Sequence, residues 1–243
     1  MKYFKWLSFS FLIFLLISCS LDSMKPPTIL VSQFTFAQDV EGWQSSYANY
    51  APSIKDSFKF SFEYGKFVIS TGDTLRAMVQ SAFNYNSKLF MYVKRQIGGL
   101  TPNKTYSILF SLQLYSQLKE PYDGDLDTYS YGSYLKVGTF KNEPVNDTIA
   151  DSSVPGGYTI VPGFDPCIGA SDGADMIYIG KIEQTGVNQN PVLLVTPNTI
   201  SEVLETADNN GKIWVVIGVN TNVPIYQSIY FSGVGLQFEE KQI

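Results

Sequence analysis

Aromatic side chains that could stack on a ligand gather in two polar stretches of the sequence. The stretch 39–50 holds Trp43, Tyr47 and Tyr50, and the stretch 115–134 holds a second group, Tyr122, Tyr129, Tyr131 and Tyr134. Sugar rings expose apolar C–H faces that stack on aromatic planes, while Asp, Asn and Gln side chains hydrogen-bond to sugar hydroxyls. These residues are therefore a candidate glycan-binding surface. The alternative is that the tyrosines pack over the edge of the fold with their hydroxyls in water.

Three aspartates alternate within the second stretch, at Asp123, Asp125 and Asp127. Carboxylate oxygens are ligands that calcium prefers. An EF-hand loop would need glycine at its sixth position and glutamate at its twelfth, where this sequence has Thr128 and Tyr134. The aspartates are thus a candidate for a looser, structural calcium site, and the alternative is a solvated acidic turn. A calcium-dependent rise of the thermal unfolding midpoint would reveal such a site.

One segment, Gly169–Gly173, satisfies the Gly-x-Ser-x-Gly pattern of hydrolases that use a serine nucleophile. That chemistry needs a base to take the hydroxyl proton, normally histidine, and the chain contains no histidine. Paired carboxylates could serve a glycosidase, but the sequence does not single out a pair. We therefore predict that the protein is not an enzyme and has no cofactor beyond the candidate calcium. A glycan-active hydrolase is the weakest alternative.

Residues 1–18 have the three parts of a bacterial export signal. Lysines precede an apolar run that ends at Ile17, and Ser18 leads into Cys19. The apolar run is shorter than the ~20 residues that a membrane-spanning helix needs. The ending resembles the lipobox of bacterial lipoproteins, which implies that Cys19 is acylated and holds the protein to a lipid membrane. Residues 19–27 are then expected to be a tether.

Composition sets further bounds on the partners and on the fold. The net charge is −5, and there is no basic cluster, so we do not expect the protein to bind nucleic acid. With Cys19 acylated, Cys167 has no partner for a disulfide. Residues 28–243 have an ordinary length for a single β-sandwich domain, and no repeat divides them.

The stretch 89–114 predicts the scaffold that must hold these side chains. Apolar residues recur every second position from Leu89 and again up to Leu114, which indicates two strands, each with a buried face. The connection 98–104 is long for a tight hairpin, so the strands are expected to lie in facing sheets. The second face of the first strand, with Phe90 and Tyr92, could meet solvent or line a groove.

Similar patterns recur along the chain, with long loops and little helix. We predict about ten strands, of which 212–219 is apolar on both faces and should be central. Residues 200–207 are the one segment with a helical pattern. Five aromatic residues at strand spacing are predicted to be core: Phe58, Phe60, Phe62, Phe110 and Trp214. The fold class that follows is all-β, a two-sheet antiparallel sandwich.

Two segments carry a resemblance to a known fold family. The segment 99–106, GLTPNKTY, and the closing strand 229–236, IYFSGVGL, resemble galactose-binding-like jelly rolls, including many carbohydrate-binding modules. The first segment also matches the tyrosine corner of fibronectin type III domains, which run to ~100 residues. The order of motifs is similar to that of a group of exported bacterial proteins without an established activity. This resemblance implies a jelly-roll sandwich.

Together these observations predict a lipid-anchored protein of the bacterial cell envelope whose sandwich binds a ligand without catalysis. A carbohydrate is the leading ligand class. The alternative is a structural or adhesion module that binds another envelope protein. The outer membrane or the cell surface is favoured over the inner membrane.

Overall fold

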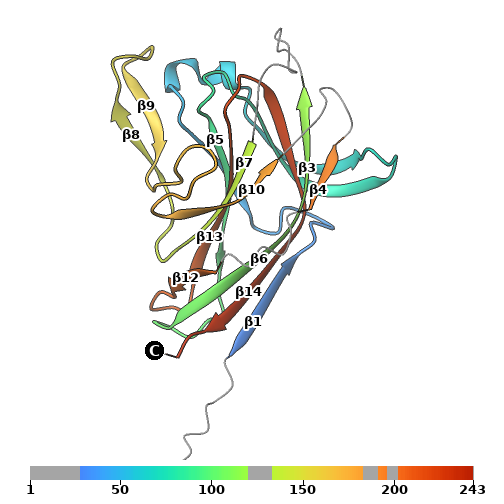
Figure 1. Ribbon diagram of the computed structural model, residues 1–243, viewed down its shortest axis with the longest axis vertical. Helices are drawn as coiled ribbons and strands as arrows, with labels where there is room; N and C mark the ends of the chain where they lie inside the picture. Colours follow the sequence, from blue (N-terminus) through green and yellow to red (C-terminus); the bar gives the residue numbers. More distant parts are fainter. Residues whose placement is uncertain (1–27, 120–132, 183–190, 196–201, 243) are drawn as a thin grey trace, which may run out of the picture.

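A computed structural model describes residues 28–119, 133–182, 191–195 and 202–242. Over these ranges the chain forms two antiparallel β-sheets that pack face to face, with a small two-stranded sheet beside them (Figure 1). The predicted all-β, two-sheet antiparallel sandwich is confirmed. Helical structure in the described ranges is limited to a 3-10 segment, Pro52–Phe58, and none of it is long and apolar enough to cross a membrane.

The larger sheet is organised around its longest strands. Strand β14 pairs with β6 along one edge, and along its other edge it pairs first with β4 and then with β1. Beyond these strands, β3 pairs with β4, and both β11 and β12 pair with β6. The bounds are β1 (Ile29–Phe34), β3 (Ser61–Val68), β4 (Thr74–Phe83), β6 (Thr105–Lys119), β11 (Val192–Val195), β12 (Val203–Thr206) and β14 (Tyr226–Glu240).

The smaller sheet has the strand order β10-β7-β13-β5-β2. Its central strand is the segment predicted to be central from its apolar faces. The separate hairpin consists of β8 and β9, which pair with each other. The bounds are β2 (Gln44–Ala48), β5 (Phe90–Ile97), β7 (Ser133–Phe140), β8 (Asn146–Ala150), β9 (Tyr158–Pro162), β10 (Met176–Ile182) and β13 (Ile213–Thr221).

The connections between strands wind the chain back and forth between the two sheets. The steps from β4 to β5, β5 to β6, β6 to β7 and β13 to β14 each pass from one sheet to the other. This is the winding of a jelly roll, in which two antiparallel sheets share one core. Strands β5 and β6 therefore lie in facing sheets, as the length of the 98–104 connection predicted.

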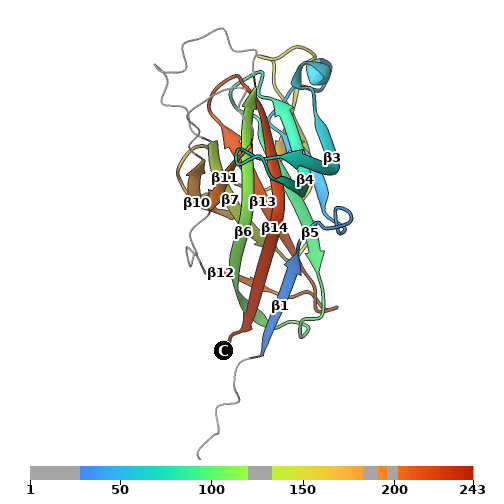
Figure 2. The same cartoon turned by 90° about the vertical axis from the view of Figure 1, so that its right-hand side faces the viewer.

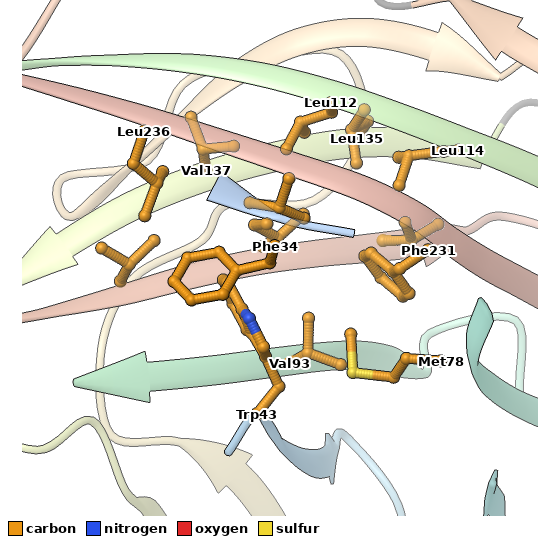
Figure 3. Close-up of a cluster of buried hydrophobic side chains, with 14 of the residues drawn as sticks. Phe34, Trp43, Met78, Val93, Leu112, Leu114, Leu135, Val137, Phe231 and Leu236 are labelled. Atoms are coloured by element: carbon orange, nitrogen blue, oxygen red, sulfur yellow. The ribbon is translucent and has the colours of Figure 1, made fainter. Parts of the chain in front are cut away.

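The main core lies between the inner faces of the two sheets (Figure 3). The larger sheet contributes residues such as Met78, Leu114 and Phe231, and the smaller sheet contributes residues such as Val93 and Val137. Because side chains of a strand alternate between its faces, each of these residues is flanked along its strand by residues of the outer face. Burial of these apolar side chains is the main favourable term that holds the sheets together.

The outer face of the smaller sheet is covered by the segment that follows β7. Phe90, Tyr92 and Val216 on this face are buried, and Phe164 of the covering segment packs against them. The second face of β5, which the sequence left undecided, is therefore neither solvent-exposed nor an open groove at these positions. Its apolar residues belong to a second buried cluster.

Two lysines are held beneath the same cover. The Lys94 ammonium donates to Glu143 Oε1 at 2.7 Å and to the Pro144 carbonyl at 2.8 Å. Lys136 is fully buried and donates to the Ser171 carbonyl. Burial raises the free energy of an ammonium unless polar groups replace its water, and here backbone carbonyls and a carboxylate do so.

Two local predictions were wrong. The segment 200–207 is not helical where the structure describes it, because Val203–Thr206 pairs with β6 as a strand. Trp214 is not part of the main core, since it lies on the outer face of β13 with the Lys94 ammonium 5.4 Å from its ring centroid. Phe58 is fully buried, and the other aromatic residues of that prediction pack against the core: Phe60, Phe62 and Phe110.

The connection between β5 and β6 is fixed by a tyrosine that reaches back along the chain. The Tyr106 hydroxyl accepts a hydrogen bond from the Thr101 backbone N–H at 2.8 Å, which is the contact of a tyrosine corner. The Leu100 N–H also donates to the Gly211 carbonyl at 3.1 Å. A Cβ at Gly211 would lie 2.0 Å from the Leu100 carbonyl oxygen, so only glycine permits this approach.

A glycine substitution tests this anchoring. Gly211 and Gly72 both have positive φ, 69° and 91°, but nothing lies within 4 Å of a Cβ at Gly72. We expect Gly72→Ala to cost about 1–2 kcal/mol for the left-handed backbone. Gly211→Ala should cost about 1–3 kcal/mol more, because backbone atoms must move apart. Urea unfolding of both variants measures the difference, and equal losses would contradict the anchoring.

Candidate functional site

Trp43 does not belong to a ligand-binding surface, which corrects the prediction. Its side chain is 2% exposed and packs edge-on against Phe34, with ring centroids 5.6 Å apart (Figure 3). The polar residues around Trp43 in the sequence suggested a loop, but Gln44–Ala48 is strand β2 of the smaller sheet. The indole therefore fills the core and cannot stack on an external ring.

Tyr47 and Tyr50 are partly buried and lie together. The Tyr47 ring stacks on Phe60 at 4.1 Å, and Tyr50 meets the edge of the same ring at 4.9 Å. The Tyr47 hydroxyl donates to the Ser61 carbonyl. Burial is the largest cause that raises the pKa of Tyr47 to about 12, so the phenol stays protonated at neutral pH. The Tyr47 side chain thus connects β2 to the start of β3.

Tyr134 lies far from this pair in the fold. It is on the outer face of β7 and meets Tyr178 with a centroid distance of 6.2 Å, while Tyr47 is on β2, with β13 and β5 between the two strands. The remaining predicted residues lie outside the described ranges: Cys19, Tyr122, Asp123, Asp125, Asp127, Tyr129 and Tyr131. Of the second aromatic stretch, the structure therefore places only Tyr134, and it does not bring Tyr134 together with Tyr47 and Tyr50.

A different concave surface forms where the β3–β4 hairpin leaves the larger sheet. Residues 78–83 of β4 pair with β14, whereas residues 74–77 pair with β3 only. The outer part of the hairpin, residues 65–77, stands out from the outer face of the sheet (Figures 1 and 2). It is held there by Phe67, whose ring packs on Tyr230 at 4.4 Å and edge-on to Tyr115 at 5.8 Å.

We call the space between this hairpin and β14 the hairpin cleft. It has a volume of about 230 Å³. Strand alternation places one face of β4 and one face of β14 toward it, together with the face of β3 that carries Glu63, Gly65 and Phe67. The residues that line it are Glu63, Gly65, Lys66 and Phe67 from β3, Val79 and Ser81 from β4, and Tyr226, Ser228 and Tyr230 from β14.

Hydrogen bonds fix the polar groups at the base of the hairpin cleft. Ser81 Oγ donates to Ser228 Oγ at 2.8 Å, and the Tyr230 hydroxyl donates to Gln117 Oε1 at 2.8 Å. Burial, the largest cause, raises the pKa of Tyr230, so its phenol remains neutral. Tyr226 and Phe67 are only partly buried, and their rings are therefore the aromatic surface in the cleft that a ligand can reach.

The hairpin cleft combines accessible aromatic rings, fixed hydroxyls and one charge of each sign, on the exposed Glu63 and Lys66. This combination suits a neutral ligand that has apolar faces and several hydroxyls. Among the described residues that line the cleft, Glu63 alone is a carboxylate, so the carboxylate pair of a glycosidase is not assembled there. No described group of His, Cys, Asp or Glu side chains is arranged to hold a metal ion.

The faces of β3 that form the hairpin cleft could be predicted from the sequence, but the pairing that completes the cleft could not. Alternation along β3 separates Phe60 and Phe62 from Glu63 on the opposite face. The position of Tyr226 beside that face depends on the pairing of β4 with β14, strands that are about 150 residues apart in sequence. Periodicity within one strand does not specify such a partner.

Comparisons with known proteins find similarity in structure but not in sequence. No protein-family model matches the chain, and no curated protein matches it in sequence. The fold is similar to that of a carbohydrate-binding module, TmCBM27, described for specific mannan recognition, with a TM-score of 0.32 and 9% identity over 88% of this chain and 99% of that one. It is also similar to peanut lectin, with a TM-score of 0.30 and 11% identity over 83% and 99% of the two chains.

Two larger proteins contain a similar arrangement of strands. One is the CBM22-1–GH10 part of Clostridium thermocellum xylanase 10B, with a TM-score of 0.34 and 8% identity over 87% of this chain. The other is the enzymatically active domain of bacteriophage CBA120 tailspike protein 4, with a TM-score of 0.33 and 9% identity over 81% of this chain. This chain spans 28% and 19% of their lengths. All these similarities are distant and concern the β-sandwich arrangement only.

The raised pKa of Tyr47 predicts a pH dependence of stability. Because the folded pKa is about 12 and the ordinary value is 10.0, stability should be intact below pH 10 and fall as pH rises toward 12. The loss should reach about 2 kcal/mol. Denaturant unfolding of wild type and Tyr47→Phe between pH 9 and pH 12 measures it. Since other buried tyrosines titrate in both proteins, only the difference between the two curves counts, and parallel curves would contradict the assignment.

Proposed function

We propose that the protein is a lipid-anchored component of the bacterial cell envelope whose β-sandwich binds a carbohydrate, without catalysis, in the hairpin cleft. The observation that carries the proposal is the lining of that cleft. Tyr226 offers an aromatic face, Ser81 and Ser228 hold hydroxyls, and Glu63 offers an acceptor. A sugar ring needs these two kinds of contact, stacking and hydrogen bonding, on adjacent sides.

The lack of a second carboxylate in the hairpin cleft favours binding over hydrolysis. Histidine, the usual base for a serine nucleophile, is absent from the whole sequence. The Gly169–Gly173 motif also has the wrong surroundings for a nucleophile elbow, since it lies in a loop before β10 and Ser171 is exposed. These points support a non-catalytic role for the described part of the chain.

Binding is tested with the full-length protein in detergent on a broad glycan array, followed by calorimetry with a glycan that binds. We expect Tyr226→Ala to weaken binding at least about tenfold, because loss of a central aromatic contact costs more than ~1 kcal/mol. Tyr158→Ala is the matched control, since this tyrosine is 56% exposed on β9 and outside the cleft. The proposal fails if no glycan binds or if Tyr226→Ala binds as well as wild type.

The alternative function, a module that binds another envelope protein, also has an observation in its favour. The β8–β9 hairpin and the segment before it expose Val145, Ile149 and Tyr158, each to about half. Large apolar side chains exposed on a small hairpin can contribute to a protein interface, and here Ile149 and Tyr158 lie on opposite faces of the hairpin. If Tyr158→Ala loses binding to an envelope protein while Tyr226→Ala binds that protein as well as wild type does, this alternative is favoured over glycan binding.

The anchor is proposed from the export signal and is tested separately. Acylation should add the mass of lipid chains to Cys19 and make the protein partition into detergent. Cys19→Ala should be recovered without this mass and in the aqueous phase, while Cys167→Ala should behave as wild type. Equal partitioning of wild type and Cys19→Ala would contradict the lipid anchor.

A further inference from the structure

A second cavity lies at the end of β7, which belongs to the smaller sheet, whereas the hairpin cleft lies on the larger sheet. Strand β10 pairs with β7 only as far as Gly138, so Thr139 and Phe140 extend beyond their edge partner. The cavity forms beside this extension and has a volume of about 280 Å³. We call it the β7 pocket. The residues that give it its chemical character are Phe140, Lys141, Glu143, Phe164, Asp175 and Glu205.

Two aromatic rings form an apolar wall of the β7 pocket. Phe140 and Phe164 lie 5.0 Å apart with an angle of 59° between their planes. Both are partly buried, and Phe164 is held from behind by Tyr92 at 5.4 Å. A fixed pair of rings of this kind can pack against the apolar body of a small ligand and attract a cation near their faces.

The charges around the β7 pocket do not cancel. Glu143 is neutralised by Lys94, with 2.7 Å between Oε1 and Nζ. Asp175 and Glu205 remain, and Lys141 is the cation that faces them. Asp175 Oδ2 accepts a hydrogen bond from the Asp165 N–H at 2.7 Å, a contact that does not offset its charge. The pocket therefore keeps a net negative charge.

Glu205 is the carboxylate of the β7 pocket that a positive partner would stabilise most. It is partly buried on β12, and its Oε1 accepts from the Thr206 N–H at 2.8 Å. Burial is the largest cause that raises its pKa, and the opposing attraction of Lys141 is the smallest of the causes. A positive ligand group beside Glu205 would replace the hydration that burial has removed.

From the rings, the charge and the partly buried carboxylate we propose that the β7 pocket binds a small organic cation, a primary amine carried on a short apolar chain, with its ammonium on Glu205 and its chain against Phe140 and Phe164. Among the described residues no group of three or more His, Cys, Asp or Glu side chains is arranged to hold a metal ion. This site is separate from the hairpin cleft, and neither proposal depends on the other.

The test uses pentane-1,5-diamine and its neutral isostere pentane-1,5-diol, with the full-length protein in detergent. Calorimetry should show saturable binding of the diamine with one site, and an affinity for the diol at least tenfold lower. Because the comparison is made on the wild-type protein, it does not depend on the folding of a variant. Equal affinities for the two compounds, or no saturable diamine binding, would overturn the proposal.

Two neighbouring variants then locate the site. Glu205→Gln should lower the diamine affinity at least tenfold. Glu202→Gln makes the same change of charge outside the pocket, at a carboxylate that pairs with Lys241 at 2.8 Å, and should leave the affinity unchanged. An unaffected Glu205→Gln, or an equal loss in Glu202→Gln, would overturn the assignment. Diamine binding that persists in Tyr226→Ala would confirm that the two sites are distinct.

Discussion

The change of partner along β14 is the constraint on which much of the larger sheet depends. One edge of β14 pairs with β6 over nearly its whole length, while the other edge pairs with β4 up to Phe231 and with β1 from Val234. A bulge between Phe231 and Gly233 separates the two regions. Bulges bend a strand and increase its twist, which lets two different strands follow one edge. Because β1 occupies this edge of β14 from Val234 onward, the outer part of the β3–β4 hairpin cannot pair with β14.

The hairpin cleft follows from this geometry. A two-stranded ribbon without a neighbour is marginal unless it packs on something, and here Phe67 packs on Tyr230 and Tyr115. Ile69 at the end of β3 is buried in the same small cluster, and the Ser70 N–H donates to the Pro191 carbonyl at 3.1 Å. The hairpin is therefore fixed at a distance from β14 that leaves a concave space. On the smaller sheet no comparable space can form over Phe90 and Tyr92, because the segment after β7 fills it.

The parts of this architecture that local patterns encode could be predicted from the sequence. Period-two alternation identified β5 and β6, a run that is apolar on both faces identified β13, and the loop 98–104 correctly placed β5 and β6 in facing sheets. Local patterns misassigned Val203–Thr206, which has helical spacing but pairs with β6. They also placed Trp43 on the surface and Trp214 in the core, because the same residue type suits both positions. The candidate site was not predicted, because Glu63 and Tyr226 come to line the same cleft only when β3, β4 and β14 pair.

The pairing of β1 with β14 also bears on the order in which the chain can fold. Ile29 is opposite Glu239, so the first described strand meets the last one. The inner positions of β14, such as Leu236 and Phe238, are buried in the core, and β4 and β6 also need this strand as their neighbour. The larger sheet therefore cannot be completed until its last strand is available, whatever forms earlier. Folds dominated by such distant pairings fold slowly, because the entropy of closing long loops is lost before the pairings that compensate for it can form.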